Sequence, residues 1–208
     1  MPASHPSQSH PLPGTLRLFV ALPLPDAVRQ TLRRVQAHLR QRDARSTVRW
    51  VEAAHWHLTL QFLGDTPSDA LSAISGALAP IAWQTAPFAL HLDRGGCFPH
   101  PQRPRVFWVG LEGELSPLYF MQRQVSSALA PWCGRAEPFQ PHVTVGRVRT
   151  SQRGKPNEAA GEIATFLSQV LISPTSWEVS HFDLMKSHLT PEGALYTRVA
   201  SFDLGQMR

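Results

Sequence analysis

Two short strings, His57-Leu58-Thr59-Leu60 and His142-Val143-Thr144-Val145, share the pattern His-x-Thr-x with an apolar residue at each x. Both lie in segments where polar and apolar residues alternate, which is typical of a β-strand with one buried face. On a strand, residues two apart point to the same face, about 6.5–7 Å from each other along the chain. Each string therefore places an imidazole beside a hydroxyl and turns its apolar residues toward a core.

Chance explains one such string more easily than two. The chain holds ten His, and requiring apolar residues at both x positions leaves about one tenth of a match expected at random. A third match, His188-Leu189-Thr190, precedes Pro191 and is interpreted as a strand end or a loop, because proline is poorly tolerated inside a paired strand. The alternative for the first two is that His and Thr are ordinary polar residues on half-buried strands.

If the two strings face each other, they surround one small anion with two imidazoles and two hydroxyls. An imidazole has an ordinary pKa near 6.5, so one ring can accept a proton while the other donates one. The hydroxyls can hold the non-bridging oxygens of a phosphate while charge builds on them. This set of residues therefore predicts phosphate ester chemistry.

Composition sets only loose limits on function. The chain has 208 residues and a formal net charge of +5, from 20 Lys and Arg against 15 Asp and Glu. This modest excess suits a polyanionic partner without identifying one. No apolar run approaches the roughly 20 residues that a membrane-spanning helix needs, so we expect no membrane segment.

Cysteine usage and the N-terminus predict a cytoplasmic protein. Cys97 and Cys133 form no CxxC pair and have no metal-like spacing, and the opening MPASHPSQSHPLPG lacks the apolar region of a secretory signal. We therefore expect reduced thiols. Gly95, Gly96 and Pro99 around Cys97 indicate a turn rather than a reactive nucleophile.

The chain is expected to form one α+β domain over residues 15–208 behind a disordered tail of Pro, Ser and His over residues 1–14. Strand–helix–strand–strand patterns occur in both halves, each with one His-x-Thr-x strand, which indicates two weak internal repeats. The expected strands span 16–22, 48–51, 56–63, 88–92, 106–111, 139–148, 176–186 and 195–204. The expected helices span 27–42, which Asp26 would cap, and 68–81, 114–129 and 162–171.

Five stretches resemble the two-histidine phosphoesterase superfamily, and within it the bacterial RNA 2′,3′-cyclic phosphodiesterases, historically called 2′-5′ RNA ligases. They are RLFVALPLPD, HWHLTLQFLG, GGCFPHPQRPRVFWVGL, FQPHVTVGRV and the closing MKSHLTPEGALYTRVASFDL. The resemblance runs from about residue 16 to residue 204. It implies a bilobal fold, in which two pseudo-symmetric lobes with antiparallel sheets and flanking helices line a central cleft.

The resemblance also assigns roles to residues. His57 is implied as the proton donor and His142 as the proton acceptor, with Thr59 and Thr144 as phosphate ligands. Arg147 matches a position that is often basic in relatives, and its alternative is a surface arginine at a strand end. The implied reaction is hydrolysis of an RNA 2′,3′-cyclic phosphate end to a 2′-phosphomonoester. The two-histidine scheme needs no metal and no cofactor, and we expect the protein to be a monomer.

Three other readings stay open from the residues alone. The first is metal-dependent hydrolysis by His57, His142 and a carboxylate, although the sequence has no HxH, HxxxH or DxD cluster nearby. The second is 2′-5′ RNA ligation by the same site, because the same residues serve both directions of one reaction. The third is an RNA-end-binding module without turnover, in which Phe62, Phe98 and Phe139 stack on bases.

Overall fold

The computed structural model describes residues 14–134, 138–149, 158–190 and 193–205, so the predicted tail, apart from Gly14, lies outside the described residues. The strands are β1 (Thr15–Pro23), β2 (Val48–Trp50), β3 (His57–Pro67), β4 (Phe88–Phe98), β5 (Val106–Gly113), β6 (His142–Val148), β7 (Ser176–Val179), β8 (His181–Thr190) and β9 (Gly193–Asp203). The helices are α1 (Asp26–Arg42), α2 (Leu71–Gln84), α3 (Leu115–Ala128) and α4 (Glu158–Gln169), and the 3₁₀ turns are η1 (Ala53–His55), η2 (Ser68–Ala70) and η3 (Ala130–Trp132).

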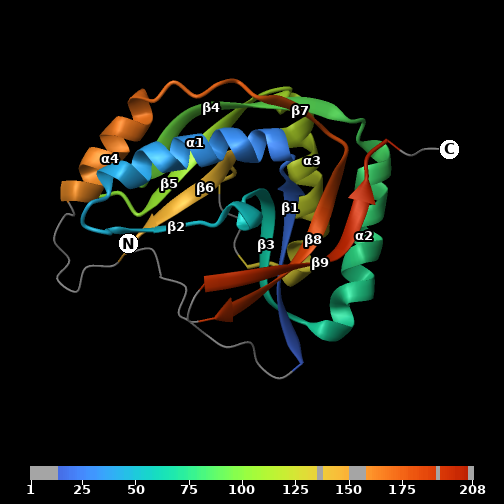
Figure 1. Ribbon diagram of the computed structural model, residues 1–208. Coiled ribbons are helices and arrows are strands. Elements are labelled where there is room, and N and C mark those ends of the chain that lie inside the picture. The colour runs from blue at the N-terminus through green and yellow to red at the C-terminus, as the bar shows by residue number, and fades with distance from the viewer. Residues whose placement is uncertain (1–13, 135–137, 150–157, 191–192, 206–208) are drawn as a thin grey trace.

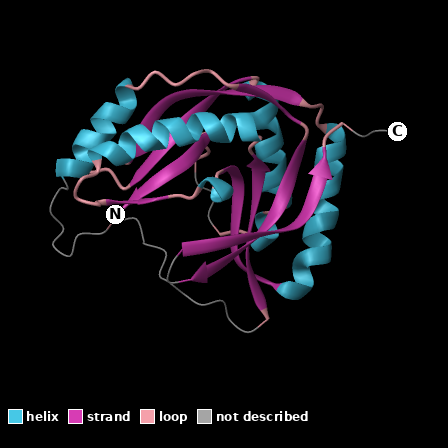
Figure 2. Cartoon of the chain, viewed as in Figure 1, coloured by secondary structure: helices cyan, strands magenta, loops and turns pink. Residues whose placement is uncertain are grey.

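The strands form an antiparallel sheet in the order β7-β4-β5-β6-β3-β1-β8-β9, and β2 pairs with β6. Strands β3 and β6 meet through one residue pair, Leu58 with Val143. This junction divides the sheet into two halves. Figure 2 shows helices against both halves.

We call the half made by β3, β1, β8 and β9 lobe 1, and the half made by β6, β5, β4, β7 and β2 lobe 2. Helices α2 and α3 pack on strands of lobe 1, whereas α4 packs on β4 of lobe 2 and α1 contacts α4 (Figure 1). The predicted bilobal α+β fold with two pseudo-symmetric lobes is confirmed.

The two repeats are interlocked rather than side by side. In each lobe the motif strand lies at the junction, the first strand of the same repeat follows, and a strand of the other repeat comes next: β3-β1-β8 and β6-β5-β4. The helix after each first strand contacts the opposite lobe, because α1 packs on α4 and α3 packs on β3. Each lobe therefore needs both halves of the chain.

Local sequence explains α1 well. Its buried residues Val28, Leu32, Val35 and Leu39 recur every three or four positions, as an amphipathic helix requires. The predicted N-cap is wrong by one residue, because Pro25 takes the cap position and Asp26 is the first helical residue. There its carboxylate still complements the positive end of the helix dipole. No helix among the described residues combines the length and apolarity needed to cross a membrane.

Strand β4 runs beyond residue 92, where the predicted strand ends, and so corrects the predicted turn around Cys97. It continues to Phe98, so Cys97 lies in a strand rather than in a turn. The adjacent glycines serve close packing: a Cβ on Gly95 would lie 2.2 Å from Leu167 Cδ1, and one on Gly96 would lie 2.4 Å from the Trp108 ring. The glycines therefore let a helix and an aromatic ring approach the strand.

Candidate active site

The junction between the lobes brings the four predicted motif residues together. Leu58 and Val143 are paired and fully buried. Because the strands are antiparallel, this register sets His57 opposite Thr144 and Thr59 opposite His142. Alternation turns all four side chains to the face away from the buried pair. The charges of Arg147 and His142 both act on His57, which agrees with a placement of two imidazoles and two hydroxyls on one shared face.

Both catalytic-candidate imidazoles are held in the same way. The Nδ1 atom of His57 lies 2.8 Å from the carbonyl oxygen of His55. The Nδ1 atom of His142 lies 2.7 Å from the carbonyl oxygen of Gln140. A carbonyl oxygen only accepts, so each Nδ1 carries the hydrogen and donates it. Each Nε2 is therefore the nitrogen that is left to exchange protons with a ligand.

Aromatic rings flank each imidazole. Phe19 of β1 lies 4.9 Å from the His57 ring centre, and Tyr196 of β9 meets the same ring edge-on at 5.3 Å. Phe98 of β4 meets the His142 ring edge-on at 5.1 Å. These contacts restrict rotation of both imidazoles and keep Nε2 in place.

Partial burial makes both imidazoles weak bases. Desolvation, together with the nearby charges of His55, Arg147 and His142, lowers the pKa of His57 to about 4 despite an opposing backbone hydrogen bond. Desolvation and then Arg147 lower the pKa of His142 below its usual 6.5, again against a backbone hydrogen bond. At neutral pH both rings are therefore mostly neutral.

Arg147 joins this site through an irregularity in β6. A residue three positions after Thr144 would point to the opposite face of a regular strand. However, β5 pairs Trp108 with Thr144 and Val106 with Arg147, with a register shift between them. The shift returns Arg147 to the face of Thr144, where its exposed side chain is within electrostatic reach of both histidines.

Of the three phenylalanines predicted to stack on bases, two lie beside the site and one does not. Phe62 is 60% exposed and lies 5.8 Å from Phe19, beside the His57 end of the site. Phe98 contacts His142 directly. Phe139 instead packs against Tyr119 and the core, and it is not among the aromatic contacts of either imidazole.

Sequence reasoning missed Tyr196 and Phe19 as site residues. Tyr196 lies in β9 and reaches His57 only because the last hairpin pairs with β1 through β8. Burial raises the pKa of the Tyr196 hydroxyl, and the charges of Arg147, Arg49 and Arg17 oppose that rise. Alternation alone gives no signal for such a non-local approach.

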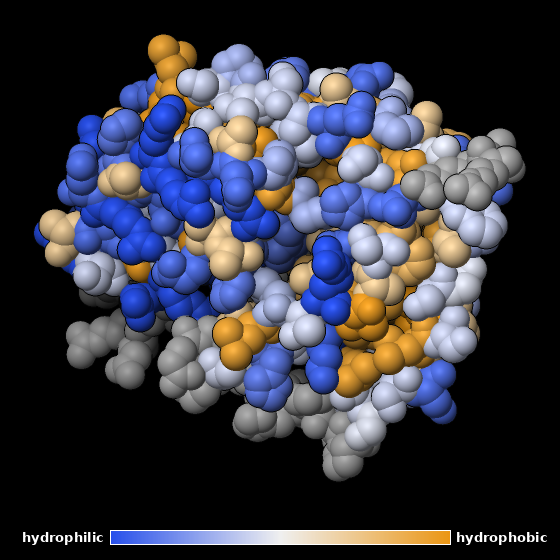
Figure 3. Space-filling model, turned by 45° about the vertical axis from the view of Figure 1, so that its right-hand side comes forward, coloured by the Kyte–Doolittle hydropathy of each residue, from blue (hydrophilic) through white to orange (hydrophobic). Residues whose placement is uncertain are grey.

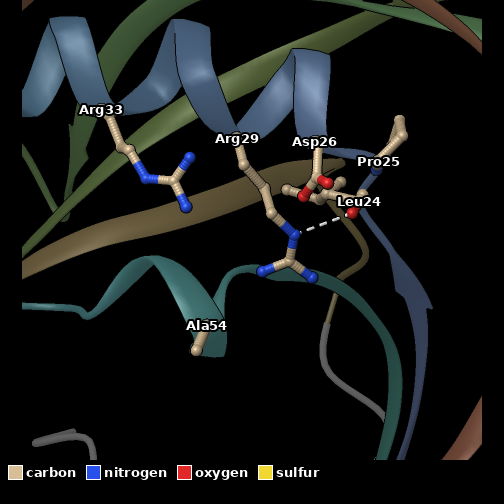
Figure 4. Close-up of a pocket in the computed structure, with 6 residues that line it drawn as sticks. All are labelled: Leu24, Pro25, Asp26, Arg29, Arg33 and Ala54. Atoms are coloured by element: carbon tan, nitrogen blue, oxygen red, sulfur yellow. Dashed lines mark hydrogen bonds between the residues drawn. The ribbon is translucent and has the colours of Figure 1, made fainter.

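None of the motif residues lines the surface depression in Figure 4. It is lined by Leu24, Pro25, Asp26, Arg29, Arg33 and Ala54. Arg29 donates from Nε to the carbonyl of Leu24 at 2.8 Å and from Nη1 to the carbonyl of Ala53. The guanidinium thus ties the start of α1 to η1, the turn that leads into His57, and fills a structural role there.

The described residues offer no metal-binding cluster, and hydrophilic side chains gather on one part of the surface. Within the described residues, no three His, Cys, Asp or Glu side chains gather in a way that could hold a metal ion. Figure 3 shows hydrophilic side chains over the part of the surface where α1 and α4 lie, and apolar ones toward the opposite side. Arg33, Arg34 and Arg40 of α1 are exposed.

Comparison with known proteins gives one family. A family model described as LigT like Phosphoesterase matches the chain twice, over residues 22–108 and 110–196, so each match contains one motif. A protein of Archaeoglobus fulgidus named RNA 2′,3′-cyclic phosphodiesterase is 34% identical over 190 residues, covering 90% of this chain and 100% of the relative. A protein of the same name from Methanothermobacter thermautotrophicus is 33% identical over 193 residues, covering 91% and 99%.

Solved structures agree with this result. Escherichia coli LigT complexed with 3′-AMP has a TM-score of 0.71 and 27% identity, covering 92% of this chain and 99% of that chain. A protein of Thermus thermophilus has a TM-score of 0.72 and 29% identity, covering 91% and 98%.

Proposed function

Because the chain belongs to the LigT-like phosphoesterase family, we propose that it hydrolyses RNA 2′,3′-cyclic phosphate ends to 2′-phosphomonoesters. The observation that carries the proposal is the junction itself, where two His and two Thr share one face and each imidazole keeps Nε2 for the ligand. The names of the relatives and the 3′-AMP bound to Escherichia coli LigT support an RNA end as substrate.

In the proposed reaction, the Nε2 atom of His142 accepts a proton from water as the water oxygen bonds to phosphorus. The bond from phosphorus to the 3′-oxygen breaks, and His57 Nε2 gives that oxygen its proton. The product is a 2′-phosphomonoester with a free 3′-hydroxyl. Thr59, Thr144 and Arg147 hold the non-bridging oxygens and stabilise the charge that builds there.

The low pKa of His57 is consistent with a proton donor that becomes protonated when the phosphate of the substrate binds beside it. A neutral imidazole cannot donate in this step, and in the ligand-free site the pKa of His57 is about 4. A phosphate anion beside the ring favours the charged form and raises that pKa. The proton donor is then produced only where a phosphate is bound.

The exposed ring of Phe62 at one end of the site supports a nucleotide rather than a bare phosphate as ligand. We also propose that residues 15–208 act as one domain and that the enzyme works as a cytoplasmic monomer. Both motifs come from one chain, and Cys97 and Cys133 are free thiols.

An RNA oligonucleotide with a 2′,3′-cyclic phosphate, incubated in ¹⁸O-labelled water, tests the proposal. Hydrolysis places one labelled oxygen in the monophosphate, which mass spectrometry detects. A longer, joined RNA without label would show ligation instead. Tight binding with unchanged ends would indicate a binding module and would refute the proposed activity.

A further inference from the structure

Each motif strand carries a β-bulge immediately after its motif threonine. In β3, Thr59 pairs with Ala21 and Gln61 pairs with Val20, which leaves Leu60 as the extra residue. A bulge disrupts the ladder locally and bends the strand.

The second strand repeats this irregularity at the equivalent place. In β6, Thr144 pairs with Trp108 and Gly146 pairs with Phe107, which leaves Val145 as the extra residue. The bulge returns Arg147 to the site face. The orientation of Arg147 toward the phosphate position therefore depends on the backbone at Val145.

The carbonyl of Val145 accepts a backbone hydrogen bond from the Val51 N–H at 3.0 Å, and a buried glutamine from α1 adds a side-chain bond to the same carbonyl. The Nε2 atom of Gln36 donates to the carbonyl of Val145 at 2.9 Å and to the carbonyl of Val51 at 2.8 Å. Its Oε1 atom accepts from Arg40 Nε at 3.2 Å. Carbonyls only accept and a guanidinium only donates, so the amide orientation is fixed by its partners. Gln36 is 7% exposed.

A second buried glutamine does the same for the other motif strand. Nε2 of Gln122, on α3, donates to the carbonyl of Leu60 at 3.3 Å, and the side chain is 8% exposed. Gln36 precedes His57 of its own repeat by 21 residues, and Gln122 precedes His142 by 20. Each glutamine therefore occupies nearly the same place in its repeat and supports the motif strand of the other repeat.

We propose that Gln36 and Gln122 are positioning residues, which hold the two bulges and thereby aim the phosphate-binding side chains. The proposal rests on the proposed function for the motif residues. Gln36 acts through Arg147, which follows the bulge that Gln36 supports. A buried amide in an apolar core has to be hydrogen-bonded to be tolerated, and both amides use the bulge carbonyls for this purpose.

The first test replaces Gln36 with methionine, which keeps the volume and removes the donors. The matched control is Thr31→Val on the same helix, since the buried Thr31 hydroxyl bonds Thr175 at 2.8 Å, away from both motif strands. With 2′,3′-cyclic AMP as substrate, Q36M should lower kcat/KM about 10- to 100-fold, as displacement of a binding group by about 1 Å does. T31V should stay within about twofold, because it shares no partner with the site.

The second test asks whether Gln36 acts through Arg147. In an Arg147→Met background, adding Q36M should lower kcat/KM by no more than about twofold further, because the group that Gln36 positions is already gone. The same loss in both backgrounds would overturn the inference and leave Gln36 a purely structural residue. Urea unfolding of each variant supplies the folded fraction used to normalise the rates.

Inorganic phosphate separates this inference from the proposed function. If the wild-type protein binds phosphate but does not hydrolyse the cyclic ester, the proposed function fails. Q36M should still raise the phosphate Kd about 10-fold relative to T31V, and an unchanged Kd would overturn the inference. If Q36M does not fold, Gln122→Met tests the same inference on β3. A kcat/KM equal to that of T31V would then refute the positioning role.

Discussion

The half-buried imidazole of His57 makes folding stability depend on pH. Its pKa is about 4 in the folded protein, against an ordinary value of 6.5. Between these two values the unfolded chain binds the proton more readily than the folded chain. The contribution to stability is therefore complete above pH 6.5 and is lost as the pH falls through 4.

A difference of about 2.5 pKa units corresponds to about 3 kcal/mol, at roughly 1.4 kcal/mol per unit. The variant His57→Asn removes the titrating ring, while its amide can still donate to the His55 carbonyl that Nδ1 now contacts. The stability of the wild type relative to this variant should therefore fall by about 3 kcal/mol between pH 7 and pH 4.

Urea unfolding at a series of pH values and constant ionic strength measures this difference. Exposed His38 on α1 supplies the control, because His38→Asn removes a histidine that is not buried. A stability difference that stays constant from pH 7 to pH 4 would refute the reasoning. Saturating phosphate should move the transition to higher pH, since the anion raises the pKa of His57.

Three further predictions concern activity and packing. His57→Ala and His142→Ala should each lower kcat by about 10²- to 10⁴-fold in a steady-state assay, and undiminished turnover in either would contradict the two-histidine mechanism. The plot of kcat/KM against pH should be bell-shaped, with the midpoints of both its rising and its falling limb below pH 6.5, because both histidine pKa values are lowered. Arg147→Met should move both midpoints to higher pH, because the positive charge that lowers the two pKa values is removed. Unmoved midpoints would contradict the role of that charge. Gly96→Ala should cost about 1–3 kcal/mol in thermal unfolding by displacing Trp108, whereas Gly76→Ala, with nothing within 4 Å, should not destabilise.

The sequence predicted much of the site because its central signal is local. The alternation in the two motifs fixes which face His57, Thr59, His142 and Thr144 share on each strand. The repeated strand–helix pattern indicated two lobes, and the family resemblance supplied their arrangement. The shared face of these residues is kept in the folded protein, because a shift of one residue in strand register would expose the apolar residues to solvent.

The remaining features depend on contacts between distant parts of the chain. The odd spacing from Thr144 to Arg147 predicts opposite faces, and only the bulge at Val145 reverses this. Likewise, Gly95 and Gly96 indicate a turn when read locally. The partners that forbid a side chain there, Leu167 and Trp108, come from another helix and another strand.

The most direct test of the central claim is phosphorus NMR of a short RNA that ends in a 2′,3′-cyclic phosphate, incubated with the protein and excess chelator. The account predicts that the cyclic signal is replaced by that of a 2′-monophosphate. A cyclic signal that persists, or a 3′-monophosphate as product, would contradict it.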